Sequence, residues 1–295
     1  MGTSQSSNGP KGGVPMVPAW TPAPPAEDPP PGDQPPGVPP DTTPDRSPPE
    51  QEPNDPAPDK PVVPNVPPPA APLAPGSRFA GTRRSLGEFA KAGNLSDLRR
   101  SLGNYVRTGY GGSRTTTSRF GGTASTASAF GGILERMGQQ PAGSPLDPAL
   151  LAGRTANEVM DAVVEAVRPV DGTQDAEAER TAIKDSLSEL LVKYPDADLS
   201  SLTPEQREFA IERFTAMDVA RRFELDVGKT IIEKAPTATV ALSRLKQVRD
   251  YIKQTVAASF RKLSAAGKSV NSNRIATVVR DALRDTFQVF EGYAE

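Results

Sequence analysis

The sequence predicts an all-α protein, in which a C-terminal bundle of about five helices follows a long, disordered, proline-rich N-terminal region. Apolar residues after position 146 recur with helical spacing, and no stretch alternates as a strand would. Of the 33 prolines, 23 lie in residues 21–75. The whole chain of 295 residues is only 36% hydrophobic and 5% aromatic, so we expect only part of it to fold.

Changes in composition divide the chain into four parts. Residues 1–20 form a glycine- and serine-rich recognition or modification peptide, and residues 21–75 form an acidic, proline-rich linker. Residues 76–145 form a basic Gly/Arg repeat region with short helices, and residues 146–295 form the all-helical domain. The linker carries nine acids and two bases, whereas residues 76–120 carry nine bases and two acids. The overall net charge of −2 therefore conceals a strongly dipolar chain.

The linker is expected to be a solvated, semi-extended spacer. Its prolines lack backbone N–H donors and fix φ near the polyproline value. Such a segment cannot bury enough apolar area to offset the entropy lost on ordering.

The basic region contains internal repeats. RRSLGEF at 83–89 recurs as RRSLGNY at 99–105, and three shorter cassettes (SRFAGT, SRFGGT and SAFGGI) begin at residues 77, 118 and 128. Their glycine content disfavours long helices. We predict short helices over residues 85–92 and 96–107, and a loop over the Ser/Thr/Gly-rich residues 108–132.

Five helices are predicted after residue 146, and several have recognisable start signals. Thr155 with Glu158 forms a capping box, and Thr203 is followed by Pro204 at the first helical position and by Gln206. The predicted helices span residues 155–168, 173–194, 203–235, 237–266 and 272–291. The apolar face of the third helix is predicted to comprise Phe209, Phe214, Met217, Ala220 and Leu225.

Composition narrows the available chemistry. The chain contains no cysteine and no histidine, which excludes disulfides and thiolate sites and removes the commonest general base near neutral pH. We predict no catalytic residue, no metal site and no cofactor. DVGKT at 226–230 lacks the first glycine of a phosphate loop and falls within a predicted helix. No secretory leader or membrane span is indicated, so we predict a cytoplasmic protein without membrane contact.

The arginine repeats are the first candidate site. Arginines interleaved with aromatic residues can bind the phosphates and bases of single-stranded nucleic acid, or can dock on another protein. In the absence of a recognisable nucleic-acid-binding fold we favour pairing with the acidic linker or docking on another protein, and keep nucleic acid as the alternative. The candidate residues are Arg83, Arg84, Arg99, Arg100, Tyr105 and Arg107.

The N-terminal peptide is the second candidate site. Gly2 permits removal of Met1, and the exposed α-amine is partly neutral and nucleophilic near pH 7. An apolar, proline-containing strip behind it offers a preformed anchor for a partner. Its residues are Val14, Pro15, Val17, Pro18 and Trp20. MGTSQS also matches the N-myristoylation pattern, so lipid anchoring is kept as a lower-ranked hypothesis. The default alternative is that the N-terminal peptide is disordered and has no role, as is common for chain ends.

Several distinctive motifs follow one another along the chain: MGTSQSS, GVPMVPAW, the RRSLG cassettes, the GYGG and FGG turns and the closing FQVFEGY. Together they resemble the QatB family of the bacterial Qat anti-phage defence system. The matching motifs occur in the same order and extend over the whole chain. The resemblance implies a defence component without catalysis of its own that works beside an ATPase, a QueC-like enzyme and a TatD-like nuclease.

The resemblance also implies a role for the N-terminus. QueC enzymes adenylate the carboxylate of a 7-deazaguanine and deliver an amine to it. In this chain the α-amine of Gly2 would serve as that amine after Met1 is removed, with Thr3 and Ser4 as the recognition sequence. The linker would then carry the modified N-terminus while the all-helical domain docks on the other components, which would make the protein an adaptor for the ATPase and the nuclease.

Overall fold

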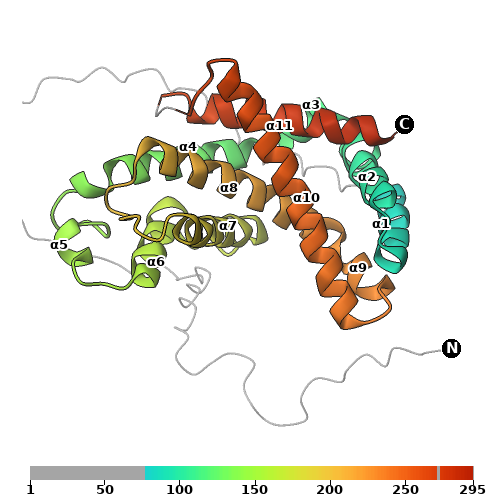
Figure 1. Ribbon diagram of the computed structural model, residues 1–295, viewed down its shortest axis with the longest axis horizontal. Coiled ribbons are helices and arrows are strands. Elements are labelled where there is room, and N and C mark those ends of the chain that lie inside the picture. The colour runs from blue at the N-terminus through green and yellow to red at the C-terminus, as the bar shows by residue number, and fades with distance from the viewer. Residues whose placement is uncertain (1–76, 271–272, 295) are drawn as a thin grey trace, which may run out of the picture. The chain divides into compact units, whose positions relative to one another are not determined.

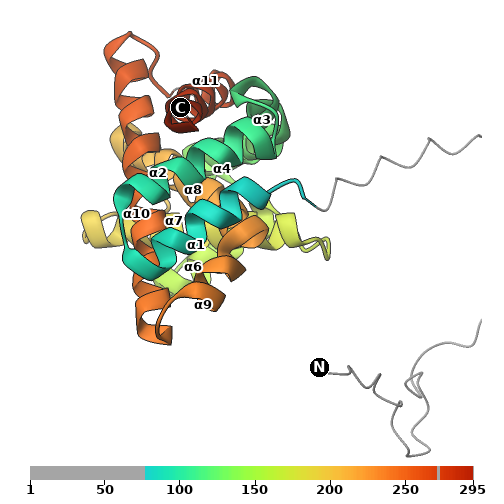
Figure 2. The ribbon, with the colours of Figure 1, turned by 90° about the vertical axis from the view of Figure 1, so that its right-hand side faces the viewer.

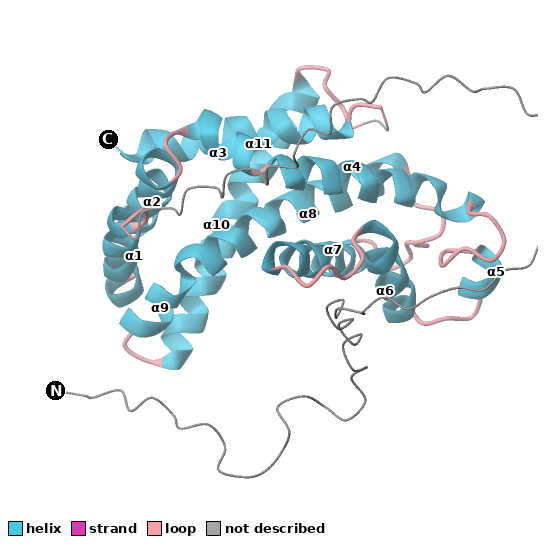
Figure 3. Cartoon of the chain, turned by 180° about the vertical axis from the view of Figure 1, so that it is seen from behind, coloured by secondary structure: helices cyan, strands magenta, loops and turns pink. Residues whose placement is uncertain are grey.

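The structure is a computed structural model, and it describes residues 77–270 and 273–294. The expectations for residues 1–20 and 21–75 lie outside the described residues. All regular elements of the described part are helical, which confirms the predicted all-α class (Figures 1 and 3). The described residues belong to one compact unit of the chain, Pro69–Glu295.

The helices follow one another with short connections. The α-helices are α1 (Ala80–Ala92), α2 (Leu95–Asn104), α3 (Ser113–Arg119), α4 (Gly121–Arg136), α5 (Pro148–Leu151), α6 (Ala156–Val167), α7 (Gln174–Lys193), α8 (Pro204–Phe223), α9 (Lys229–Lys234), α10 (Ala238–Ala265) and α11 (Ile275–Glu291). Four short helical turns complete the chain: η1 (Tyr105–Gly109), η2 (Met137–Gln139), η3 (Glu224–Gly228) and η4 (Gly292–Ala294). Helix α8 packs against α4, α7 and α10 and lies at the centre of the assembly (Figure 1).

The predicted start signals are confirmed. The side chain of Thr155 accepts a hydrogen bond from the backbone N–H of Glu158, and the Glu158 carboxylate accepts one from the N–H of Thr155. Thr203 and Gln206 form the same reciprocal pair at the start of α8. These local contacts satisfy backbone donors that have no partner within the helix, which is why such starts can be predicted from sequence.

The third predicted helix is confirmed as the run α8–η3–α9, but one residue of its predicted apolar face is wrong. Leu225 is 54% exposed, whereas Phe223 and Val227 on either side are buried. Both Leu225 and Val227 lie in the π-helical turn η3. A wider turn shifts the following residues around the helix axis, so spacing counted at 3.6 residues per turn no longer selects the core face.

The predicted loop over residues 108–132 is wrong, because most of this stretch forms α3 and α4. Helix α4 packs between α8 and α11 (Figure 1). A Cβ atom on Gly131 would lie 2.4 Å from Cδ1 of Ile275 and 2.9 Å from Cδ1 of Ile211. The glycines suggested a loop because they lower helix propensity, but the same small residues are needed for neighbouring helices to pack closely against α4.

One hydrophobic core joins residues from both sides of position 145. The ring of Phe120 lies 5.0 Å from that of Phe287, and the ring of Phe130 lies 5.8 Å from that of Phe214. The basic repeat region thus supplies aromatic side chains to the same core as the five predicted helices.

Candidate functional site

The two RRSLG cassettes lie on α1 and α2, which form an antiparallel hairpin (Figure 2). The connection passes through Gly93, whose φ of 79° suits glycine. The Ser101 hydroxyl donates to the carbonyl of Thr82 at 3.2 Å, and the Asn104 amide donates to the Ser85 hydroxyl at 3.2 Å. These contacts place the two cassettes at the same level of the hairpin.

The repeated residues divide between an inner and an outer face. Ser, Leu and Gly of both cassettes are buried, and both arginine pairs are exposed. A Cβ atom on Gly103 would lie 2.5 Å from the backbone nitrogen of Ala294, so glycine allows the C-terminal turn η4 to cover α2. The repeat therefore encodes a packing face with a cationic outer surface.

The arginines of the hairpin have different environments. Arg83 and Arg84 are exposed, and no carboxylate of the described residues lies within ion-pair distance of either. Arg99 donates from Nε to the Tyr251 hydroxyl at 3.1 Å. Arg100 pairs with Asp97 at 3.2 Å, and Arg107 donates to the carbonyl of Ala294 at 3.5 Å.

Tyr105, predicted as a surface docking residue, lies in the core with 1% of its surface exposed. Its hydroxyl and that of Tyr110 each donate to Oδ2 of Asp226 at 2.8 Å. Burial is the main cause that raises the pKa of Tyr105 well above its usual range. Of the other aromatic residues interleaved with the arginines, Phe79, Phe89 and Phe120 are also buried, whereas Tyr110 is half-buried. The four buried rings therefore cannot stack on nucleobases, because burial in the core occupies their faces.

Basic charge is concentrated in the first three helices. Residues 77–120 carry nine cations, and within the described part only Lys91 and Arg100 of these have an ion-pair partner. The hairpin surface, defined here as the exposed side chains of Arg83, Arg84, Arg99 and Arg100, is the part of this region that the cassettes present to solvent.

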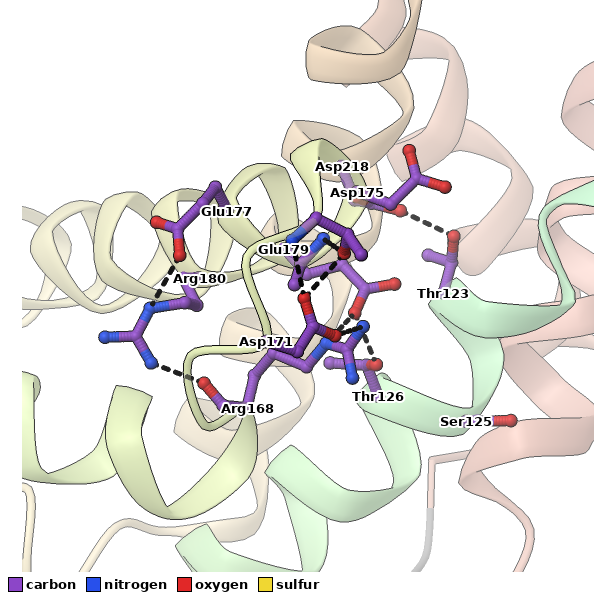
Figure 4. Close-up of polar contacts among 12 residues, drawn as sticks. Thr123, Ser125, Thr126, Arg168, Asp171, Asp175, Glu177, Glu179, Arg180 and Asp218 are labelled. Atoms are coloured by element: carbon purple, nitrogen blue, oxygen red, sulfur yellow. Dashed lines mark hydrogen bonds and ion pairs between the residues drawn. The ribbon is translucent and has the colours of Figure 1, made fainter. Parts of the chain in front are cut away.

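A second polar feature is a buried charge network that joins α4, α7 and α8 (Figure 4). Glu179 of α7 is 3% exposed and accepts a hydrogen bond from the Thr126 hydroxyl of α4 at 2.9 Å. Arg222 of α8 donates to the same carboxylate at 3.1 Å, and Nε of Arg168 lies 2.9 Å from it. Each oxygen of Glu179 thus has a cationic partner.

Asp218 is the second buried acid of the network. It is completely buried, its Oδ2 accepts from the Thr123 hydroxyl at 2.5 Å and lies 3.3 Å from Nε of Arg222, and its Oδ1 has no hydrogen-bond partner. Burial raises the pKa of Asp218 to about 6, although Arg222 opposes that shift. The network ties three helices together, and none of its members was predicted from the sequence. The only feature of the sequence that could have indicated this network was the presence of acidic residues within the apolar stretches of α7 and α8.

Asp218 makes the free energy of unfolding depend on pH. Its pKa in the folded protein, about 6, exceeds the ordinary aspartate value of 3.8, so the folded state binds more protons between these two values. Stability is then lost as pH rises through about 6, by roughly 3 kcal/mol for this group. We expect Asp218→Asn to become more stable relative to the unmodified protein by up to that amount between pH 4 and pH 7, measured by urea unfolding. A difference that is constant across this range would contradict the prediction.

Neither a metal-binding cluster nor a membrane-spanning helix is present among the described residues. No group of acidic side chains in the described ranges is arranged to hold a metal ion. None of the helices in this part of the chain combines the length and apolar character needed to cross a membrane.

Comparison with known proteins identifies the family. Neither the curated proteins nor the solved structures include a significant match to this chain. A protein-family model described as "Qat anti-phage system associated protein QatB" matches residues 111–290, which is more than half of the chain. The match runs from the start of α3 to the end of α11 and leaves the hairpin of α1 and α2 outside it. The chain belongs to the QatB family of Qat anti-phage system associated proteins.

Proposed function

We propose that this protein is a non-enzymatic adaptor of an anti-phage defence system, modified at its N-terminus and docked through its hairpin surface. In this proposal a QueC-like partner conjugates a 7-deazaguanine to the α-amine of Gly2 after Met1 removal. The folded part then brings the modified N-terminus to the ATPase and the TatD-like nuclease of the system. Family membership supports the role in anti-phage defence.

The observation that carries the docking role is the hairpin surface. The hairpin of α1 and α2 lies on an outer layer of the fold (Figure 2). Its four cassette arginines are exposed, and three of the four have no carboxylate partner among the described residues. Guanidinium groups pair with carboxylates in bidentate geometry and are enriched in protein interfaces. Such a surface suits an acidic face of a partner protein.

The buried acids support a structural role for the rest of the fold. Glu179 and Asp218 would be the natural candidates for proton transfer, but both lie in the interior between helices and contact arginine and threonine side chains. A catalytic acid or base must reach a substrate proton. Their placement favours a scaffold that presents its surface and its N-terminus.

Nucleic-acid binding is the competing function for the same arginines. With Phe79, Phe89, Tyr105 and Phe120 in the core, its contacts would be charge contacts with phosphates and stacking on the half-buried Tyr110 alone. The protein-docking role is favoured because burial removes four of the five aromatic side chains that the nucleic-acid hypothesis needs for base stacking.

Charge reversal tests the docking role. We expect the double variant Arg83→Glu, Arg84→Glu to lose co-purification with the other components of the system and to lose phage protection. The matched control is Arg136→Glu, Arg154→Glu, which makes the same charge change on exposed residues near α5, at the opposite end of the described fold (Figure 1). Equal behaviour of the two variants would refute the docking surface. Loss of salt-sensitive DNA or RNA binding with co-purification intact would favour the nucleic-acid function.

A further inference from the structure

A polar cavity of about 340 Å³ lies where the start of the described chain meets α7 and α8. Its wall combines side chains from segments that are far apart in the sequence. They are Arg78, Tyr110, Arg119, Gln174, Asp175, Arg222, Leu225 and Asp226. The cavity is separate from the hairpin surface, and neither the proposed docking nor the modification of Gly2 uses it.

The two acids of the cavity are already engaged. Asp226 accepts hydrogen bonds from the hydroxyls of Tyr105 and Tyr110, both at 2.8 Å. Asp175 lies 3.6 Å from Arg222, which also pairs with Glu179 and Asp218. Arg222 is therefore the counter-charge of the buried network and contributes little free positive charge to the cavity.

Two cations remain on the cavity wall without such a partner. No carboxylate of the described residues lies within 4.0 Å of the guanidinium nitrogens of Arg78 or Arg119. Arg119 is exposed at the end of α3. Two guanidinium groups without acidic partners on one small cavity match a ligand that carries two negative charges.

Arg78 is held in position without a ligand. Its Nε donates to the carbonyl of Gly109 at 2.7 Å, and its guanidinium carbon lies 4.0 Å from the centre of the Tyr110 ring and 4.7 Å from that of Phe79. Gly109 allows this packing, because a Cβ atom there would lie 2.5 Å from the Phe79 ring. The terminal nitrogens of Arg78 stay available, and their fixed orientation reduces the entropy lost on binding.

We propose that this cavity binds a small phosphate-bearing molecule, with its phosphate between the guanidinium groups of Arg78 and Arg119. The oxygens of one phosphate group can pair with both arginines, and a guanidinium fork binds a phosphate through two parallel hydrogen bonds. The hydroxyl of Tyr110 and the amide of Gln174 lie on the same wall and offer polar contacts to the remainder of the ligand. The volume of about 340 Å³ limits that remainder to a small molecule.

Calorimetric titration of the full-length protein with inorganic phosphate tests the proposal, at ionic strength held constant with sodium chloride. We expect saturable binding that Arg119→Gln weakens by roughly tenfold or more, since one charge-assisted contact is removed. Arg114→Gln is the matched control, because Arg114 is exposed on the same helix α3 but does not line the cavity. It should bind phosphate as the unmodified protein does.

A second variant and a second ligand make the test decisive. Arg78→Gln should weaken binding to a similar degree, with far-UV circular dichroism as the check on folding. Non-saturable heats, or equal weakening by Arg114→Gln and Arg119→Gln, would overturn the proposal. Binding of a 5′-phosphorylated oligonucleotide without any binding of inorganic phosphate would also overturn it. That result would indicate that Arg78 and Arg119 bind the 5′ end of a nucleic acid.

Discussion

Replacing Gly2 with tryptophan is expected to abolish both the partner-dependent mass increase at the N-terminus and phage protection. The proposed conjugation needs an unhindered α-amine on a glycine that has lost Met1. A bulky second residue both retains Met1 and blocks entry into a narrow active site. The measurement is the mass of the N-terminal peptide from protein expressed with its neighbouring genes, together with the plating efficiency of phage.

The control is Gly9→Trp, the same substitution at another glycine of the N-terminal peptide. It should keep both the added mass and the protection. Protection by Gly2→Trp at the level of the unmodified protein would rule out modification of Gly2 as the functional step. Added mass on Gly2 when the protein is expressed alone would instead remove the QueC-like partner from the proposal.

The second large effect is expected from Glu179→Ala, which should lower the free energy of unfolding by about 3–5 kcal/mol. The substitution removes the carboxylate that pairs with Arg168 and Arg222 and accepts from Thr126. Arg222 would be left with a buried charge and one fewer partner, next to an acid of raised pKa. Urea unfolding monitored by circular dichroism at pH 7 measures the loss.

Glu177→Ala is the matched control for Glu179→Ala. Glu177 lies two residues earlier on the outer face of α7, with 56% of its side chain exposed and Arg180 at 3.7 Å. An exposed pair at that distance contributes little, so this variant should unfold near the unmodified protein. Comparable destabilisation by the two variants would show that the buried network is not what holds α7 against α4 and α8.

The five C-terminal helices could be predicted because their signals are local. Capping residues contact backbone groups three positions away, and an apolar face needs only a repeating spacing. The failure at Leu225 has the same origin, since the π-helical turn η3 changes the spacing without any residue that marks it.

The arginines of the cassettes and Tyr105 were predicted as surface docking residues, and for Tyr105 this prediction was wrong. Arginine next to phenylalanine or tyrosine in the sequence says little about which side of a helix each occupies. In the fold the rings of Phe79, Tyr105 and Phe120 pack inside, while the arginines of the cassettes face solvent. The large apolar area of each ring makes burial the favourable outcome wherever a core is within reach.

The sequence by itself determined the all-α class, the starts of the principal helices, the exposed arginine pairs of the cassettes and the family resemblance, because each depends on residues close together in the chain. The tertiary structure alone decided that residues 113–119 and 121–136 are helical and that Thr123, Thr126, Glu179 and Asp218 form one network. It also brought Arg78, Arg119 and Arg222 to one cavity. Small, weakly helix-forming residues become helical when close packing against α8 and α11 stabilises them, and buried charges are tolerated only where distant segments supply their partners.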